Sequence, residues 1–185
     1  MVEQKFTIVK EKEKVLAEPF LGIFQSLEIA EWAFDCMKDL SDKLGVITET
    51  DERIALIYRK DKKGIHFNFS NWLLLGFYGG KNKLVVRIPI LKEKLASLNT
   101  KVDYKVEYEF KTEPKIVSVS FSLSSLEQIG NEILDLYDLT IDQIGQIFKS
   151  RKKSPMRHKH NTQLGKALFD QTDRDSLFFE GLHTE

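Results

Sequence analysis

Glu107, Glu109 and Lys111 form the most specific pattern for chemistry in this sequence, because they occupy alternate positions of Glu-Tyr-Glu-Phe-Lys. In an extended strand, every second side chain points to the same side, so the two carboxylates and the amine would share one face. Carboxylate oxygens are ligands that Mg²⁺ accepts, and a neighbouring lysine can orient or activate a water molecule.

The segment Glu109-Phe-Lys111 resembles the acid-x-lysine half of the PD-(D/E)xK nuclease motif. The resemblance covers three residues. It implies a Mg²⁺-dependent nuclease with a further acid on a neighbouring strand, and Asp51 or Asp61 would have to supply that acid. The same spacing arises wherever charged and apolar residues alternate along a half-buried strand. The nuclease with Glu107, Glu109 and Lys111 is therefore an alternative, and we otherwise expect no catalytic residue, metal or cofactor.

Histidine and cysteine offer little further chemistry. His158 and His160 lack the additional ligands at zinc-site spacing, so we interpret them as part of a basic tail. His66 follows the polar side of an expected strand, which favours a surface position. Cys36 lies in an expected helix with no histidine nearby in sequence, so a small apolar filler is the simpler interpretation than a nucleophile.

Positive charge gathers in two regions, although the 28 basic and 28 acidic side chains of the whole chain cancel. A neutral chain needs a local patch to contact nucleic acid. The first region surrounds two expected hairpin turns and consists of Lys60, Lys62, Lys63, Lys81, Lys83 and Arg87. The second is a basic C-terminal block and consists of Arg151, Lys152, Lys153, Arg157 and Lys159.

Asn71, Trp72 and Tyr78 lie between these regions in the sequence and offer base-edge hydrogen bonds and stacking. We therefore predict a non-catalytic binding domain that recognises nucleic acid, with DNA favoured over RNA as the ligand. Such a domain could belong to a larger DNA-processing system. The alternative from another class is a module for protein interaction or self-association. Apolar residues at 117–123, 141–148 and 178–179 would supply its contact surface.

A mainly antiparallel sheet must position these side chains. Apolar and alternating patterns predict strands at 54–59, 65–69, 72–78, 84–90, 102–110 and 116–123, with turns at 60–64 and 79–83. Residues 72–78 are apolar on both faces, which predicts a central strand covered on both sides. Pro89 is expected to end its strand or to place it at an edge. Residues 102, 104, 106, 108 and 110 form an apolar face that a helix should cover. The fold class is α+β, with five to seven strands over about residues 53–123.

Helical periodicity predicts an N-terminal helix at 26–44 and a C-terminal helix pair within 125–149. Ser26 and Gly45 are the expected start and stop of the first helix. In the pair, the second helix is expected to begin at Thr140. We expect residues 1–150 to form one domain, followed at 151–185 by a basic segment, a short helix and a loose tail.

Composition sets the remaining bounds on the 185-residue chain. Hydrophobic residues make up 42% and charged residues 30%, which is typical of a folded globular protein. A single cysteine excludes an intramolecular disulfide and favours a reducing compartment. Without a signal-peptide pattern or a long apolar stretch, we expect a cytoplasmic protein with no membrane contact.

Overall fold

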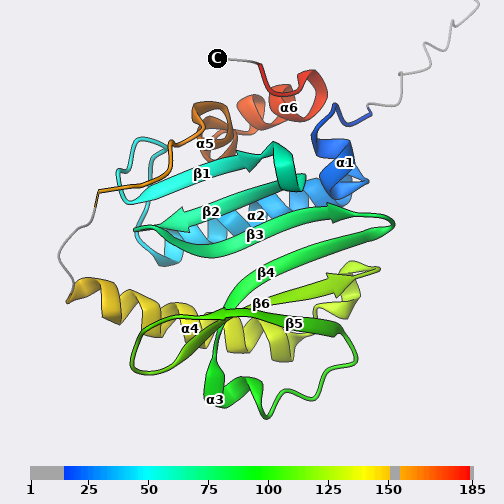
Figure 1. Cartoon of the computed structure of the whole chain (residues 1–185). Coiled ribbons are helices and arrows are strands. Elements are labelled where there is room, and N and C mark those ends of the chain that lie inside the picture. Colours follow the sequence, from blue (N-terminus) through cyan, green and yellow to red (C-terminus); the bar gives the residue numbers. More distant parts are fainter. Residues whose placement is uncertain (1–14, 151–154, 184–185) are drawn as a thin grey trace, which may run out of the picture.

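A computed structural model of the chain describes residues 15–150 and 155–183, and it contains one six-stranded antiparallel sheet in the order β1-β2-β3-β4-β6-β5 (Figure 1). The strands are β1 (Ile54–Arg59), β2 (Gly64–Phe69), β3 (Trp72–Gly80), β4 (Lys83–Leu91), β5 (Asp103–Glu109) and β6 (Ile116–Leu123). The α-helices are α1 (Phe20–Phe24), α2 (Leu27–Lys43), α3 (Lys92–Leu95), α4 (Asn131–Lys149), α5 (Thr162–Phe169) and α6 (Gln171–Glu180). Two 3₁₀ turns are η1 (Lys60–Lys62) and η2 (Leu126–Gln128). The predicted α+β class is confirmed.

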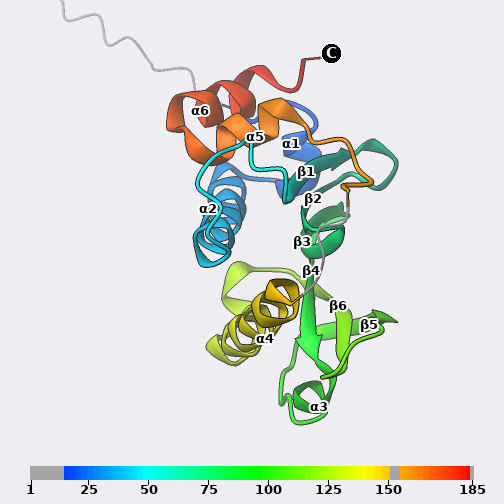
Figure 2. The same ribbon diagram turned by 90° about the vertical axis from the view of Figure 1, so that its left-hand side faces the viewer.

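Helices α2 and α4 lie side by side on one face of the sheet, and α1 packs there against β3 (Figures 1 and 2). The strand side chains on that face interlock with the helices around a core rich in aromatics. Seven phenylalanines are fully buried: Phe20, Phe24, Phe34, Phe67, Phe77, Phe121 and Phe178. Among the described residues, no helix lies over β3, β4 and β6 on the opposite side, which we call the open face (Figure 2). Strand register places His66, Gly76, Arg87 and Ser120 in one row across it.

Pro89 lies inside β4, so the expectation that it ends the strand is wrong. β4 is not an edge strand of the sheet, but at Pro89 it is paired with β6 alone, so Pro89 occupies a local edge. The ladder between β3 and β4 stops at Gly76 and Arg87, and Pro89 lies beyond that point. A proline has no amide hydrogen to donate, and because no β3 residue is paired with Pro89, no ladder hydrogen bond is lost there. The hydroxyl of Tyr137 donates to the carbonyl of Leu74 at 3.1 Å where β3 has left the ladder.

A bulge in β5 changes the expected alternation. The pairing with β6 shifts between Val106 and Tyr108, so Tyr108 lies opposite Ser118 and Glu109 opposite Val117. Glu107 therefore keeps to the open face, whereas Glu109 turns to the helix face. The prediction of one uninterrupted apolar face under a helix is wrong, because β5 is an edge strand and Tyr104, Val106 and Tyr108 are 41 to 46% exposed.

One helix replaces the expected pair near the C-terminal part of the sheet. At the start of the expected pair, a capping box of Ser125 and Gln128 encloses only the short turn η2, and α4 then runs unbroken from Asn131. Thr140 does not begin a helix. Its buried hydroxyl donates to the Leu136 carbonyl at 2.7 Å and accepts from the amide of Leu91 at 3.0 Å, which joins the end of β4 to α4.

The C-terminal residues form two packed helices. The first, α5, agrees with the expected short helix, whereas the expectation of a loose tail is wrong over 171–180, which form α6. Leu164 and Phe178 are fully buried, and Phe178 meets Phe34 of α2 edge-to-face at 5.0 Å. Arg174 is also buried and forms ion pairs with Glu31 and Asp35 of α2 at 3.1 and 2.8 Å. The core of the sheet domain therefore extends beyond residue 150.

The two edges of the sheet differ. At β1, the backbone of Leu56 donates to the imidazole of His160 and accepts from the amide of Asn161. At β5, no strand of the described residues pairs with the outer side. A search of the described helices for one long and apolar enough to cross a membrane finds none.

Candidate nucleic-acid interface

The two lysine-rich turns meet at one end of the sheet. Arg59 pairs with Gly64 across the first turn and Gly80 with Lys83 across the second, and the amide of Gly79 donates to the carbonyl of Lys63 at 2.9 Å. Both turns therefore lie at the same end, bonded to each other. The five exposed lysines they carry form what we call the hairpin surface: Lys60, Lys62, Lys63, Lys81 and Lys83.

The lysines of the hairpin surface have no carboxylate partner within the described residues. Asp61, the acid within the first turn, is held by the guanidinium of Arg59 through two hydrogen bonds of 3.0 and 3.1 Å. These bonds keep the pKa of Asp61 below its ordinary value. The local acid is thus neutralised by an arginine, and the lysine charges are left uncompensated.

Gln25 and Gly79 hold the turns in place. The side-chain amide of Gln25 donates to the carbonyls of Gly80 and Lys83 at 3.1 and 3.2 Å, which ties the second turn to the end of α1. A Cβ on Gly79 would lie 2.0 Å from the carbonyl oxygen of Gly22, so only glycine permits this approach of α1 to β3. The backbone that carries the lysines is therefore fixed before any ligand arrives.

Gly64, the last residue of the turn expected at 60–64, does not take the left-handed position of that turn. Lys63, with φ 45°, takes the left-handed position of the first turn, and Gly64 begins β2. A Cβ on Gly64 would lie 2.6 Å from the Tyr78 ring, and one on Gly76 would lie 3.1 Å from it. The two glycines make room for that ring to lie along the open face.

Arg87 and Tyr78, both predicted contacts, belong to the open face and not to the hairpin surface. Tyr78 is only 8% exposed, and burial raises the pKa of its hydroxyl. The guanidinium of Arg87 lies 5.0 Å from the Tyr78 ring centroid and forms an ion pair of 3.3 Å with Glu107. It also donates to the hydroxyl of Ser120 at 3.1 Å. Both predicted contacts are thus engaged within the sheet.

Asn71 and Trp72 lie at the opposite end of the sheet. β3 is nine residues long, so the two ends are about 25 Å apart at roughly 3.3 Å per residue. Asn71 donates to the carbonyl of Pro155 at 2.9 Å and accepts from the amide of Arg157 at 2.7 Å. The Trp72 ring stacks on Phe110 at 4.5 Å.

The predicted basic C-terminal block is only partly described. Arg151, Lys152 and Lys153 lie outside the described residues. Arg157 is bound near Asn71, and exposed Lys159 follows it towards the β1 edge. The described members of this block therefore share the end of Asn71 and Trp72, away from the hairpin surface.

The nuclease residues do not converge. Glu107 is paired with Arg87 on the open face, and Glu109 is paired with Lys92 at 2.6 Å on the other face. The hydrogen bond from Lys92 keeps the pKa of Glu109 below its ordinary value. The two expected partner acids are bound elsewhere, Asp51 to Arg53 and Asp61 to Arg59. Within the described residues, no group of three or more His, Cys, Asp or Glu side chains is placed to hold a metal.

His66 is buried, so the expectation that it lies on the surface is wrong. It is 7% exposed, and its ring meets the Tyr78 ring at 5.2 Å. Burial, reinforced by the charges of Arg59 and Arg87, lowers the pKa of His66 to about 4. The alternation of strand residues placed His66 on the correct face, but it did not reveal that Tyr78 would cover it.

The open face also holds buried polar atoms that the sequence did not single out. Asn68 Oδ1 and Tyr78 OH have no hydrogen-bond partner among the described residues. Gln25 was likewise missed, because a residue that ends a short helix carries no distinctive pattern.

Comparison of the sequence with protein-family models gives no match, and neither the curated proteins nor the solved structures yield a significant relative.

Proposed function

We propose that this protein binds the phosphate backbone of nucleic acid through the hairpin surface. The observation that carries the proposal is the hydrogen bond from the Gly79 amide to the Lys63 carbonyl. It joins the first turn to the end of β3, just before the second turn, so that five lysines without carboxylate partners among the described residues occupy one end of the sheet. Such a group of cations attracts a polyanion and releases its counterions.

The chemistry of the surface favours backbone contacts over base readout. Lysine ammonium groups act as flexible point charges towards phosphate oxygens. Neither predicted stacking residue is available for stacking here, since Tyr78 lies at this end but is buried, and Trp72 lies at the opposite end. We therefore expect binding with little sequence preference.

The test is a titration of a short fluorescent duplex DNA at several salt concentrations. Each phosphate contact adds about 0.9 to the slope of log K against log salt on duplex DNA. The triple variant Lys62→Gln/Lys63→Gln/Lys81→Gln should flatten that slope by about two to three and weaken binding at low salt.

A matched control changes three exposed lysines elsewhere, Lys94→Gln/Lys101→Gln/Lys166→Gln, and removes the same net charge. The control should bind as the wild type does. Equal losses in both variants would show a general charge effect and would contradict the hairpin surface. Negligible binding by the wild type at low salt would reject nucleic-acid binding altogether.

A second candidate is self-association through the outer edge of β5. The observation in its favour is that Tyr104, Val106 and Tyr108 are exposed on a strand with no outer partner among the described residues. An open strand edge pairs readily with another strand. The partner strand would be β5 of a second molecule of the same protein. A mass that rises with concentration, and that Val106→Lys returns to the monomer, would support it. A concentration-independent monomeric mass would reject it.

A further inference from the structure

A cleft of about 820 Å³ opens at the end of the sheet opposite the hairpin surface. It lies between the C-terminal ends of α2 and α4 and the turn that joins β2 to β3. Its apolar wall is formed by Leu44, Phe69, Trp72, Ile141 and Phe148. Its polar lining includes Arg53, Asn71, Lys149 and Arg157. Its size falls within the range of small-molecule sites, about 300 to 1,000 Å³, and polar and charged side chains make up more than half of its lining residues.

Gly145 is an unusual choice of residue for this wall. It lies inside α4, where glycine costs about 1 kcal/mol relative to alanine. A Cβ at this position would meet no atom within 4 Å, so packing in the described structure does not require a glycine. It lines the cleft, and the missing side chain leaves the helix backbone open to whatever enters. A ligand that approaches the α4 backbone closely at this position would explain why it is occupied by glycine.

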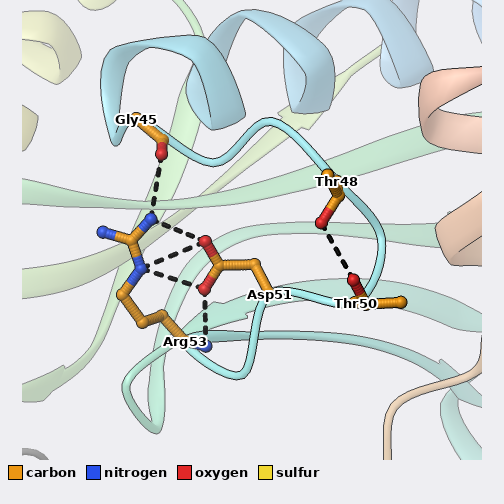
Figure 3. Close-up of polar contacts among 5 residues, drawn as sticks. All are labelled: Gly45, Thr48, Thr50, Asp51 and Arg53. Carbon is orange, nitrogen blue, oxygen red and sulfur yellow. Dashed lines mark hydrogen bonds and ion pairs between the residues drawn. The ribbon is translucent and has the colours of Figure 1, made fainter.

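Arg53 lines the cleft. Figure 3 shows that its guanidinium is anchored by Asp51 and by the backbone of Gly45. Its Nε and Nη2 atoms donate to the carboxylate of Asp51 at 2.6 to 3.2 Å, and Nη2 also donates to the carbonyl of Gly45 at 2.9 Å. The guanidinium lies over the Phe69 ring at 5.6 Å. Nη1 makes no hydrogen bond to any described residue, so an arginine of fixed orientation retains donors for an acceptor.

The remaining charges suit a small anion and not a polyanion. Arg53 and Lys43 are already compensated by Asp51 and Asp138. Lys149 and Arg157 have no carboxylate partner in the described part of the chain, and Asp142 is the acid among the lining residues. The C-terminal end of α4 adds partial negative charge that Lys149 offsets. The surplus of positive charge is therefore modest.

We propose that this cleft binds a small organic anion, with its carboxylate, phosphate or sulfonate group on Arg53 Nη1 and its apolar body against Gly145 and the apolar wall. The site is independent of the hairpin surface. It lies at the other end of β3, and it relies on one anchored arginine and apolar contact in place of several lysines.

The test uses 1-anilinonaphthalene-8-sulfonate, an aromatic anion that fluoresces in apolar sites, as the probe. We expect saturable binding of one probe per chain. The variant Gly145→Phe should weaken this binding about tenfold or more, because the added ring fills the cleft. N-phenyl-1-naphthylamine, which has the same aromatic body without the sulfonate, should bind more weakly than the anion.

The matched control is Gly130→Phe, at the start of the same helix. Gly130 also has no atom within 4 Å of a Cβ, but it is exposed and does not line the cleft. The Gly130→Phe variant should bind the probe as the wild type does. Urea unfolding should show that Gly130→Phe and Gly145→Phe are both folded. Undiminished binding by folded Gly145→Phe, or equal binding of the charged and neutral probes, would overturn the proposal. So would the absence of saturable binding by the wild type.

Discussion

The imidazole Nδ1 of His160 accepts a hydrogen bond of 3.0 Å from the amide of Leu56, and the amide of the next residue, Asn161, donates to the carbonyl of Leu56 at 2.8 Å. Both backbone groups of one β1 residue are thus bonded by residues more than a hundred positions away. An accepting Nδ1 requires a neutral ring with its proton on Nε2. Burial favours the same state, because it lowers the pKa of His160.

Replacing His160 with alanine should destabilise the fold by about 1 to 2 kcal/mol, since the Leu56 amide loses its acceptor. Urea unfolding of the variant measures this loss. His158→Ala is the control, because His158 is exposed and should change stability little. Equal stability of the two variants would contradict a structural role for His160.

His66 should make the fold sensitive to mild acid. Its pKa is about 4 in the fold and about 6.5 in an unfolded chain, so protons bind preferentially to the unfolded state between these values. The neutral His66 therefore contributes to the free energy of unfolding at neutral pH, and this contribution is lost as the pH falls from about 6.5 towards 4. Between pH 7 and pH 5 it amounts to about 2 kcal/mol. Unfolding free energies measured at both values check this.

The variant His66→Gln separates this effect from the titration of other groups. It cannot titrate, so its stability should fall by less than that of the wild type over the same pH interval. An identical fall in both proteins would show that His66 does not control the acid sensitivity.

Gly79→Ala should be strongly destabilising, by about 2 kcal/mol or more, because the new methyl group would overlap the backbone of α1 at Gly22. Gly130→Ala, where a Cβ meets open space, provides the comparison. Thermal unfolding of both variants measures the difference. If α1 yields without cost, Gly79→Ala will melt at the temperature of Gly130→Ala.

Arg174 should be essential for attaching the two C-terminal helices. Besides its ion pairs, it donates to the carbonyl of Ala167 at 3.2 Å and lies 5.5 Å from the Phe34 ring. Arg174→Met keeps much of the volume but leaves Glu31 and Asp35 without their partner, and it should cost about 2 kcal/mol. Lys166→Met, an exposed change on α5, should cost far less in the same unfolding experiment. Similar losses would show that the charge network contributes little.

The strands could be predicted from the sequence because alternation survives in edge and central strands alike. Predicted residues 54–59 and 116–123 coincide with β1 and β6. The bulge at Glu107 could not be predicted, because an inserted strand residue leaves the local pattern of charged and apolar types unchanged. The pairing between β3 and β4 stops at Gly76, which allows a proline at position 89. That stop also depends on tertiary geometry and leaves no local pattern in the sequence.

Helices were less predictable wherever a polar residue is buried. Thr140 looked like a helix start, but its hydroxyl serves the Leu91 amide inside α4. α6 carried little periodicity because Arg174 occupies one of its buried positions. For the hairpin surface, the five turn lysines were expected, whereas the separation of Asn71 and Trp72 from them required the strand directions. Arg53 and Gly145 were missed because the cleft forms only when α2, α4 and the β2 to β3 turn come together.

The different treatment of the two sheet edges has a consequence for aggregation. A sheet that exposes both edges can add molecules at each side and grow into a fibre. Here His160 and Asn161 occupy the outward backbone groups at the centre of β1, while no described strand pairs with the outer side of β5. If two molecules paired through β5, each would use up its open edge, and growth by this route would stop at two chains. By occupying β1, the C-terminal segment removes a second edge at which strands could add.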